Sequence, residues 1–148
     1  MEGPRKKTVI IVGVPGVGKS TIISNATITL QKKGTTLNTV VFGSVMFEEA
    51  KKLGINDRDQ IRKQTIDVQQ RLQNMTADHI SSLNDSIVVV DTHLFIKTQS
   101  GYYPGLPMNL ILKLNPERLI LITADSEEIL NRRKNDSTRT RDLISDDE

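Results

Sequence analysis

Residues 13–20 read Gly-Val-Pro-Gly-Val-Gly-Lys-Ser and fill every fixed position of the phosphate-loop pattern G-x-x-x-x-G-K-[ST]. A β-branched run at 8–12 precedes this segment, and apolar residues recur at helical spacing through 19–33 after it. This context argues against a glycine-rich turn that binds nothing. The segment therefore predicts a phosphate site where a buried strand turns into the N-terminus of a helix.

The residue types of the loop explain how it binds an anion. Gly13, Gly16 and Gly18 lack a Cβ, so we expect positive φ angles that turn backbone N–H groups inward around a phosphate. In this pattern the ammonium of Lys19 lies on the β- and γ-phosphates of a nucleotide, and the hydroxyl of Ser20 binds Mg²⁺.

Strand-like and helix-like segments alternate along the chain. Apolar β-type runs occupy 8–12, 39–42, 87–91 and 119–123, and helical patterns occupy 19–33, 45–53, 65–83 and 126–135. This alternation predicts a single α/β domain over 1–148, in which helices cover both faces of a parallel sheet. Ligands of such sheets bind at the carboxyl ends of the strands, so we expect the functional residues to follow each strand.

Two later strands are followed by suitable residues. Asp91 ends an apolar strand, as in the Walker B pattern, where the carboxylate holds Mg²⁺; a role in the next turn is the alternative. The segment 43–47 begins a helix whose N-terminus is a candidate for a second anion site. A plain helix cap by Ser44 is the simpler explanation of that segment. His93 is a candidate substrate contact because it follows Asp91 so closely.

Basic residues cluster near the C-terminus, where Arg132, Arg133, Lys134, Arg139 and Arg141 lie within ten positions. A solvated helix face explains Arg133 or Lys134. Phosphoryl transfer favours a second interpretation, because arginine forks bind the charged oxygens of the transferring group. We expect either Arg132 or Arg133 to point inward, since helical spacing separates them. Arg139 and Arg141 lie in a polar stretch that predicts a flap closing over phosphates.

The remaining features are less specific. His79 lies in a long polar helix and is expected to face solvent, and two isolated histidines make no metal triad. Residues 102–107 form a rigid aromatic loop that either connects to a helix at 109–114 or floors a base pocket. The chain has no cysteine, a net charge of +2 and no apolar run near the roughly 20 residues of a membrane span. We therefore expect a cytoplasmic protein without disulfides and without nucleic-acid or membrane partners.

Over nearly its whole length the chain resembles the archaeal-type adenylate kinases, which are P-loop nucleoside monophosphate kinases. The segments that carry this resemblance lie, in family order, at 13–21, 43–54, 57–62, 90–93, 97–107, 114–116, 124–133 and 138–142. The phosphate loop is shared by many nucleotide hydrolases, whereas Asp-Thr-His at 91–93 and Tyr-Pro-Gly-Leu-Pro at 103–107 are much more specific.

The resemblance implies Mg²⁺-dependent transfer between ATP and AMP, ATP + AMP ⇌ 2 ADP, in a cytoplasmic homotrimer. It implies that the ATP phosphates are held by Gly13, Val14, Pro15, Gly16, Val17, Gly18, Lys19, Ser20 and Thr21, with Ser20 and Asp91 on the metal. It implies an AMP-binding region at 44–84 that uses Ser44, Phe47, Arg58, Arg62 and His93. It also implies a short lid at 132–142, in which Arg132, Arg139 and Arg141 act together with Lys19 on the transferring group.

The chain departs from the family pattern in two places. Ser44 stands where many members of the wider kinase family have Asp after the glycine. Beyond the lid, the family continues with a helix, a fifth strand and a terminal helix. We therefore expect a P-loop sheet with four strands present and the fifth missing, with an exposed apolar edge and an open flank on the first strand.

Three alternative functions stay open. The acceptor is another nucleoside monophosphate or a small alcohol in the first, and the chain is an inactive nucleotide-binding fragment in the second. The third is a nucleotide-dependent switch. Against the switch, Asp91 is followed by Thr-His instead of the x-x-Gly of a switch, and an Asn-Lys-x-Asp guanine signature does not occur.

Overall fold

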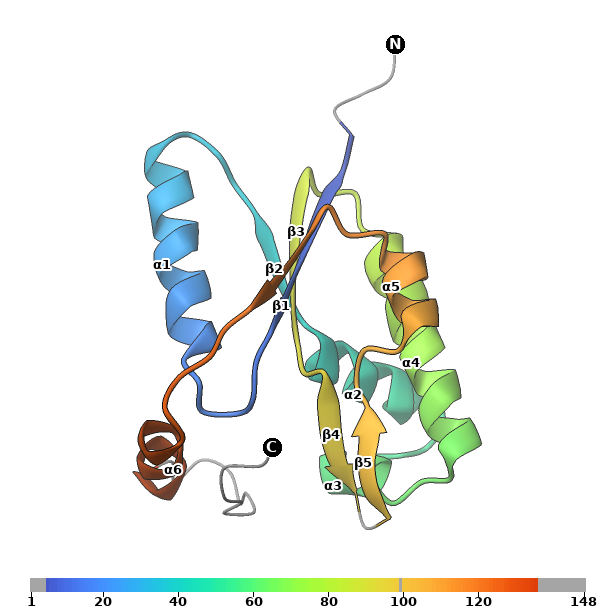
Figure 1. Ribbon diagram of the computed structural model, residues 1–148. Helices are drawn as coiled ribbons and strands as arrows, with labels where there is room; N and C mark the ends of the chain where they lie inside the picture. Colours follow the sequence, from blue (N-terminus) through green and yellow to red (C-terminus); the bar gives the residue numbers. More distant parts are fainter. Residues whose placement is uncertain (1–4, 99, 136–148) are drawn as a thin grey trace.

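The computed structural model describes residues 5–98 and 100–135 (Figure 1). Its elements, in chain order, are β1 (Lys7–Val12), α1 (Lys19–Lys32), β2 (Asn38–Val41), α2 (Phe42–Lys52), α3 (Arg58–Ile61), α4 (Ile66–Ser81), β3 (Ile87–Thr92), β4 (Phe95–Thr98), β5 (Gly101–Pro104), α5 (Met108–Leu114), β6 (Arg118–Leu121) and α6 (Ser126–Asn135). Across the described residues, no helix combines the length and the apolar character that crossing a bilayer requires.

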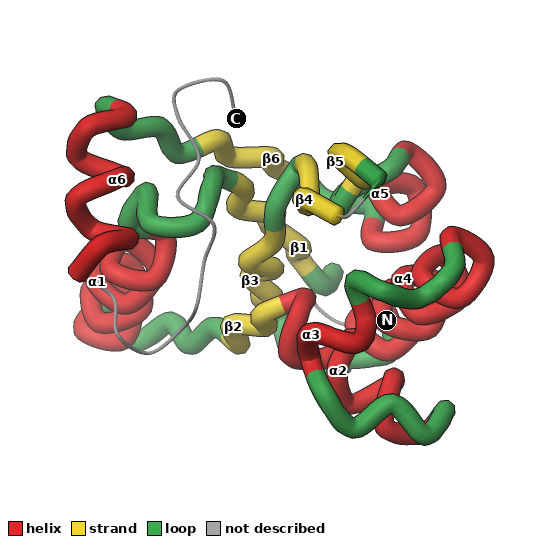
Figure 2. The backbone as a smooth tube through the Cα atoms, turned by 90° about the horizontal axis from the view of Figure 1, so that it is seen from below, coloured by secondary structure: helices red, strands yellow, loops and turns green. Residues whose placement is uncertain are grey.

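The main sheet has four parallel strands in the order β2-β3-β1-β6. Figure 2 shows α1 and α6 on one side of the sheet and α2, α4 and α5 on the other. This confirms the prediction of a parallel sheet with helices on both faces. Because all four strands run the same way, their carboxyl ends lie together at one end of the sheet, where the loop after β1 and the start of the β4–β5 hairpin also lie.

The two faces of the sheet have cores of different size. Alternate residues of β1 point to opposite faces, so Ile10 and Val12 join the large cluster under α2, α4 and α5, while Ile11 joins a small cluster with Ile23 of α1. Ile10 and Leu72 are fully buried, and burial of such a side chain contributes about 1.5–3 kcal/mol. The large cluster therefore holds α4 and α5 firmly against the strands that end at the phosphate loop.

Among the described residues, β2 and β6 are the edge strands of the sheet, and β1 is a central strand. Ile10 pairs with Val90 of β3 on one side and with Leu119 of β6 on the other. The expectation of an open flank on the first strand is therefore wrong, because the chain returns from α5 across the sheet and β6 fills that place. The expected apolar edge is confirmed, since Leu119, Ile120 and Leu121 are 44–60% exposed.

Two short elements were not predicted. An antiparallel hairpin of β4 and β5 includes the start of the segment 102–107 that was expected as a loop. In it Phe95 pairs with Pro104, and Gly101 has a φ of 115°. The single turn of α3 begins after Asp57, whose side chain accepts a hydrogen bond from the Asp59 N–H. Both elements lie near the end of the sheet formed by the carboxyl ends of its strands, where the phosphate loop also lies (Figure 1).

Candidate phosphate-binding site

The loop between β1 and α1 has the conformation of an anion cradle. Gly16 and Gly18 have φ angles of 90° and 99°, and Gly18 is the N-cap of α1, so the first N–H groups of that helix face the loop. Gly13 differs from the expectation, because its φ is not positive. A Cβ on Gly13 would lie 2.8 Å from both the Ile122 carbonyl oxygen and Val17 Cγ1. Close packing therefore explains this glycine.

The side chain of Lys19 is buried against the phosphate loop. Its side chain is 7% exposed, and its Nζ donates a hydrogen bond to the Gly13 carbonyl oxygen at 2.8 Å. The same Nζ lies 3.0 Å from Nδ1 of His93 and 3.7 Å from Oδ1 of Asp91. Three segments, the end of β1, the start of α1 and the end of β3, thus bring one cation, one carboxylate and one imidazole together.

Asp91 lies inside β3, where it pairs with Ile11 on one side and with Val41 on the other. The alternative of a turn residue is therefore wrong. Asp91 and Ser20 line the same groove of about 340 Å³, between α1 and the strands β2 and β3. Both offer oxygen atoms, which is the donor type that Mg²⁺ prefers. Among the described residues, no group of three or more His, Cys, Asp or Glu side chains gathers as a metal site.

A second cationic site forms where α2 meets α3. Nη2 of Arg58 donates a hydrogen bond to Oγ of Ser44 at 2.6 Å, and the same guanidinium lies over the Phe47 ring at 5.9 Å. Ser44 is inside the first turn of α2, which begins at Phe42, so the explanation of Ser44 as a plain helix cap is wrong. Arg62 follows the end of α3 and is exposed.

Helix α6 contacts the phosphate loop through both of its arginines. Nη1 of Arg132 donates to the Gly16 carbonyl oxygen at 3.2 Å, and the same side chain pairs with Glu128. Nε of Arg133 donates to the Pro15 carbonyl oxygen at 2.8 Å, and Arg133 is 6% exposed. The expectation that one of the two arginines points inward is confirmed, because Arg133 is buried while Arg132 is exposed. The explanation of Arg133 as a solvated residue is wrong.

The lid predicted at 132–142 is described only at its start. Arg139 and Arg141 lie outside the described residues, so their predicted contacts with phosphates stay predictions. His79 is half exposed, as expected, and its Nδ1 lies 3.6 Å from Oε1 of Glu49.

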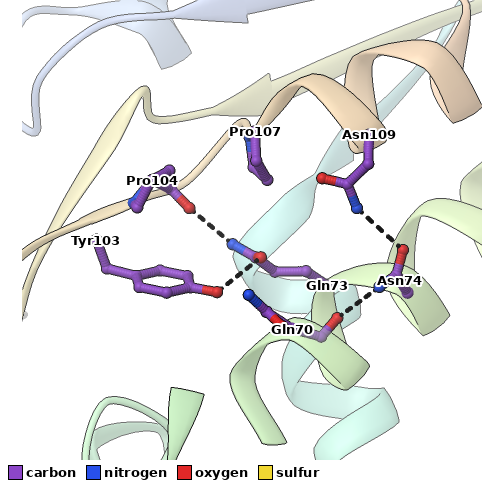
Figure 3. Close-up of a pocket in the computed structure, with 7 residues that line it drawn as sticks. All are labelled: Gln70, Gln73, Asn74, Tyr103, Pro104, Pro107 and Asn109. Atoms are coloured by element: carbon purple, nitrogen blue, oxygen red, sulfur yellow. Dashed lines mark hydrogen bonds between the residues drawn. The ribbon is translucent and has the colours of Figure 1, made fainter. Parts of the chain in front are cut away.

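A cavity of about 330 Å³ lies between α4, β5 and the start of α5 (Figure 3). It is lined by Gln70, Gln73, Asn74, Tyr103, Pro104, Pro107 and Asn109. Gln73 donates to the Pro104 carbonyl oxygen at 2.9 Å and accepts from the Tyr103 hydroxyl at 3.4 Å. Burial raises the pKa of Tyr103 above its usual value, while a hydrogen bond with Gln70 opposes this, so the phenol is neutral at neutral pH. Part of segment 102–107 thus lines a cavity.

Sequence reasoning missed the contacts that come from outside the loop. It did not place His93 against Lys19, because 74 positions separate the two residues. It also did not identify Gln70 and Gln73, since glutamines on a helix are ordinary solvent-facing residues and no local pattern distinguishes these two.

The sequence is similar to known proteins over most of its length. A family model described as AAA domain matches residues 12–148. The adenylate kinase of Methanocaldococcus jannaschii is 45% identical over 143 residues, which cover 95% of this chain and 74% of that protein. The adenylate kinase of Thermoplasma acidophilum is 45% identical over 134 residues, covering 90% of this chain and 69% of that protein.

A likeness of fold extends to a solved structure. The crystal structure of TT1252 from Thermus thermophilus matches with a TM-score of 0.55 and 15% identity, covering 92% of this chain and 75% of that one. At this level of identity the match supports the arrangement of the sheet and helices alone.

Proposed function

This chain belongs to the adenylate kinase family, and we propose that it transfers a phosphoryl group reversibly between ATP and AMP, ATP + AMP ⇌ 2 ADP. The observation that carries the proposal is the presence of two cationic sites near the same end of the sheet, at the carboxyl ends of its strands. One is Lys19 in the phosphate loop, and the other is Arg58 beside Ser44. A kinase of this kind needs one such site for the donor phosphates and one for the acceptor phosphate.

The donor site is the loop with the start of α1, residues 13–21. The positive φ angles of Gly16 and Gly18 and the N-terminus of α1 favour an anion there. Lys19 lies nearest to the proposed position of the β- and γ-phosphates, where its ammonium offsets charge that develops on the transferring group. Because catalysis of this reaction depends mainly on position and charge, a buried lysine that is hydrogen-bonded to the Gly13 carbonyl oxygen suits the role.

Ser20 and Asp91 are the proposed protein ligands of Mg²⁺. They would hold the ion because both present oxygen atoms, the donor type that Mg²⁺ prefers, to one groove. When bound, the ion neutralises charge on the β- and γ-phosphate oxygens. In the protein itself, Asp91 also attracts Lys19, whose ammonium lies 3.7 Å away.

The proposed acceptor site uses Ser44, Phe47, Arg58 and Arg62 within the region 44–84. Arg58 is held between the Ser44 hydroxyl and the Phe47 ring, and we expect its remaining N–H groups to bind a phosphate at the N-terminus of α2. Arg62 lies at the end of α3, one turn after Arg58, and is the second proposed phosphate ligand. His93 is also expected at this site, and its Nδ1 lies within hydrogen-bonding distance of Gly13 and Lys19 of the donor loop.

The cavity of Figure 3 is the proposed pocket of the acceptor base. Side-chain amides bind the edge of adenine through paired donors and acceptors, and the Tyr103 ring and two prolines offer apolar faces. Gln70, which lies beside the Tyr103 hydroxyl, is the residue that we expect to read the base, because both the nitrogen and the oxygen of the Gln73 amide are already bonded, to Pro104 and to Tyr103.

The lid, the assembly and the location are proposed from the resemblance. Arg132, Arg139 and Arg141 would neutralise the transferring group after the lid at 132–142 closes, which requires Arg132 to exchange its bonds with Gly16 and Glu128 for bonds with phosphate. A homotrimer in the cytoplasm is the proposed state, and sedimentation velocity on the purified chain tests the trimer.

The test of the proposed function is a panel of acceptors. ADP formation from ATP and Mg²⁺ is followed with AMP, CMP, UMP and GMP in separate reactions, and AMP is expected to give the highest kcat/KM. Lys19→Ala should abolish turnover, whereas Lys33→Ala, an exposed residue after α1, should not. Preference for another acceptor contradicts the proposal, as does a folded but inactive wild-type chain. Gln70→Leu should reduce the preference for AMP over the other acceptors.

A further inference from the structure

We propose that His93 is a positioning residue: its imidazole fixes the Lys19 ammonium and the Gly13 carbonyl together, and so sets where the loop cation stands during transfer. This inference rests on the proposed function and gives His93 a role at the donor loop. His93 acts through Lys19 and Gly13, and no contact with a substrate is needed.

The geometry is a triangle of three polar atoms. Nδ1 of His93 lies 2.8 Å from the Gly13 carbonyl oxygen and 3.0 Å from Nζ of Lys19, and Nζ of Lys19 lies 2.8 Å from the same carbonyl oxygen. An Nδ1–H group donates to the carbonyl, whereas an unprotonated Nδ1 accepts from the ammonium. In either tautomer the ring occupies the space beside the ammonium and limits where it can move.

The position of the ring is itself fixed by the base of the β4–β5 hairpin. Gly105 packs so closely against His93 that a Cβ on Gly105 would lie 2.3 Å from the His93 carbonyl oxygen. The Gly105 N–H donates to the Leu94 carbonyl oxygen at 2.8 Å, which closes the hairpin directly after His93. Gln73 of α4 donates a hydrogen bond to the Pro104 carbonyl oxygen and so connects this end of the hairpin to the core. The backbone of His93 therefore has little freedom.

The carboxylate of Asp91 attracts the Lys19 ammonium away from Gly13 and His93. Its Oδ1 lies 3.7 Å from Nζ of Lys19, beyond the hydrogen-bonding distance, while Gly13 and His93 lie within it. Without the imidazole, the ammonium is free to move toward Asp91, the proposed metal ligand, and away from the donor phosphates. A displacement of about 1 Å at a reacting centre can lower the rate about 100-fold.

The first experiment compares kcat and KM for three variants. We expect His93→Ala to lower kcat about 10- to 100-fold while KM for ATP and for AMP changes by less than about threefold. His93→Asn should recover most of the loss, because the oxygen and nitrogen of its amide are bonded to Cγ, as Nδ1 is in histidine. His79→Ala is the matched control and should keep the wild-type kcat. Thermal melting shows whether each variant is folded.

The second experiment does not depend on activity. The chain contains two histidines, so the imidazole ¹⁵N signals of His79 and His93 can be assigned by substitution. Lys19→Met should shift the Nδ1 signal of His93 and leave the signals of His79 unchanged. An unshifted His93 signal, or a folded His93→Ala variant with wild-type kcat, would overturn the inference. An inactive wild-type chain whose His93 signal still responds to Lys19→Met would contradict the proposed function and leave the contact supported.

Discussion

Nε of Arg133 donates a hydrogen bond to the Pro15 carbonyl oxygen at 2.8 Å, across 118 positions of the sequence. Arg132 makes a similar bond to Gly16, one residue further along the same loop. A Cβ on Gly16 would lie 3.3 Å from Cγ of Arg133, so helix and loop are also in close contact. The loop after β1 is thus held in shape by the last described helix of the chain.

We expect Arg133→Ala to destabilise the fold, because it removes a buried, charged donor from a backbone carbonyl. The free energy of unfolding should fall by about 1.5–3 kcal/mol, measured by urea denaturation. Lys134→Ala is the control, since Lys134 is exposed on the same helix and should change the free energy by less than about 0.5 kcal/mol. Equal stability of the two variants would contradict the role given to Arg133.

Gly13 and Gly43 provide a matched pair of glycine substitutions. A methyl group on Gly13 would enter space already filled by Ile122 and Val17, so Gly13→Ala should lower the unfolding free energy by about 1–3 kcal/mol. No atom lies within 4 Å of a Cβ on Gly43, which is inside α2, so Gly43→Ala should raise it by about 0.5–1 kcal/mol. Differential scanning calorimetry checks both, and a stabilised Gly13→Ala variant would contradict the packing argument.

The sheet could be predicted because the sequences of its strands have a clear apolar pattern. Strands covered on both faces must be apolar at nearly every position, so the runs around Ile10, Val40 and Val89 stand out in the sequence. The phosphate loop then fixes the direction of the first strand and helix. Four strand positions and the site at their carboxyl ends follow from these local patterns.

The contacts that complete the site could not be predicted, because no local pattern specifies them. The pairing of β1 with β6 decides which strand lies at the edge, and it depends on where the chain crosses after α5. The partners of His93 and Arg133 depend on how distant segments dock once the core has formed. Periodicity shows which face of a helix is buried, but it does not identify the carbonyl that an arginine on that face will meet.

Arg58→Ala should weaken the acceptor site selectively. Loss of a charged hydrogen-bond donor to phosphate should raise KM for AMP about 10- to 100-fold, while KM for ATP changes by less than about threefold. Arg58→Lys should recover only part of this, because an ammonium cannot form the two parallel bonds of a guanidinium. Arg71→Ala, an exposed residue of α4, serves as the control. An equal rise in both KM values would argue against a separate acceptor site at Arg58.

Asp91→Asn should change how activity depends on the Mg²⁺ concentration, with little change to the fold. The amide keeps the shape of the side chain but loses the charge that attracts the cation, so the Mg²⁺ concentration for half-maximal activity should rise about tenfold or more, equivalent to about 1.4 kcal/mol. The measurement is a Mg²⁺ titration of activity at constant ATP, with Asp67→Asn, at an exposed position of α4, as the control. An unchanged titration would exclude Asp91 as a metal ligand.

Leu121→Lys should make the chain less prone to associate through the edge of its sheet. Among the described residues, β6 ends the sheet, and its Leu121 is 60% exposed. An edge that is both unpaired and apolar is a template for pairing with another chain, and a lysine there opposes such pairing. Dynamic light scattering at rising protein concentration should therefore show less self-association for Leu121→Lys than for the wild type. Leu112→Lys, which changes a more exposed leucine on α5, should have a smaller effect, and a larger effect of Leu112→Lys would locate the association on the helical face instead.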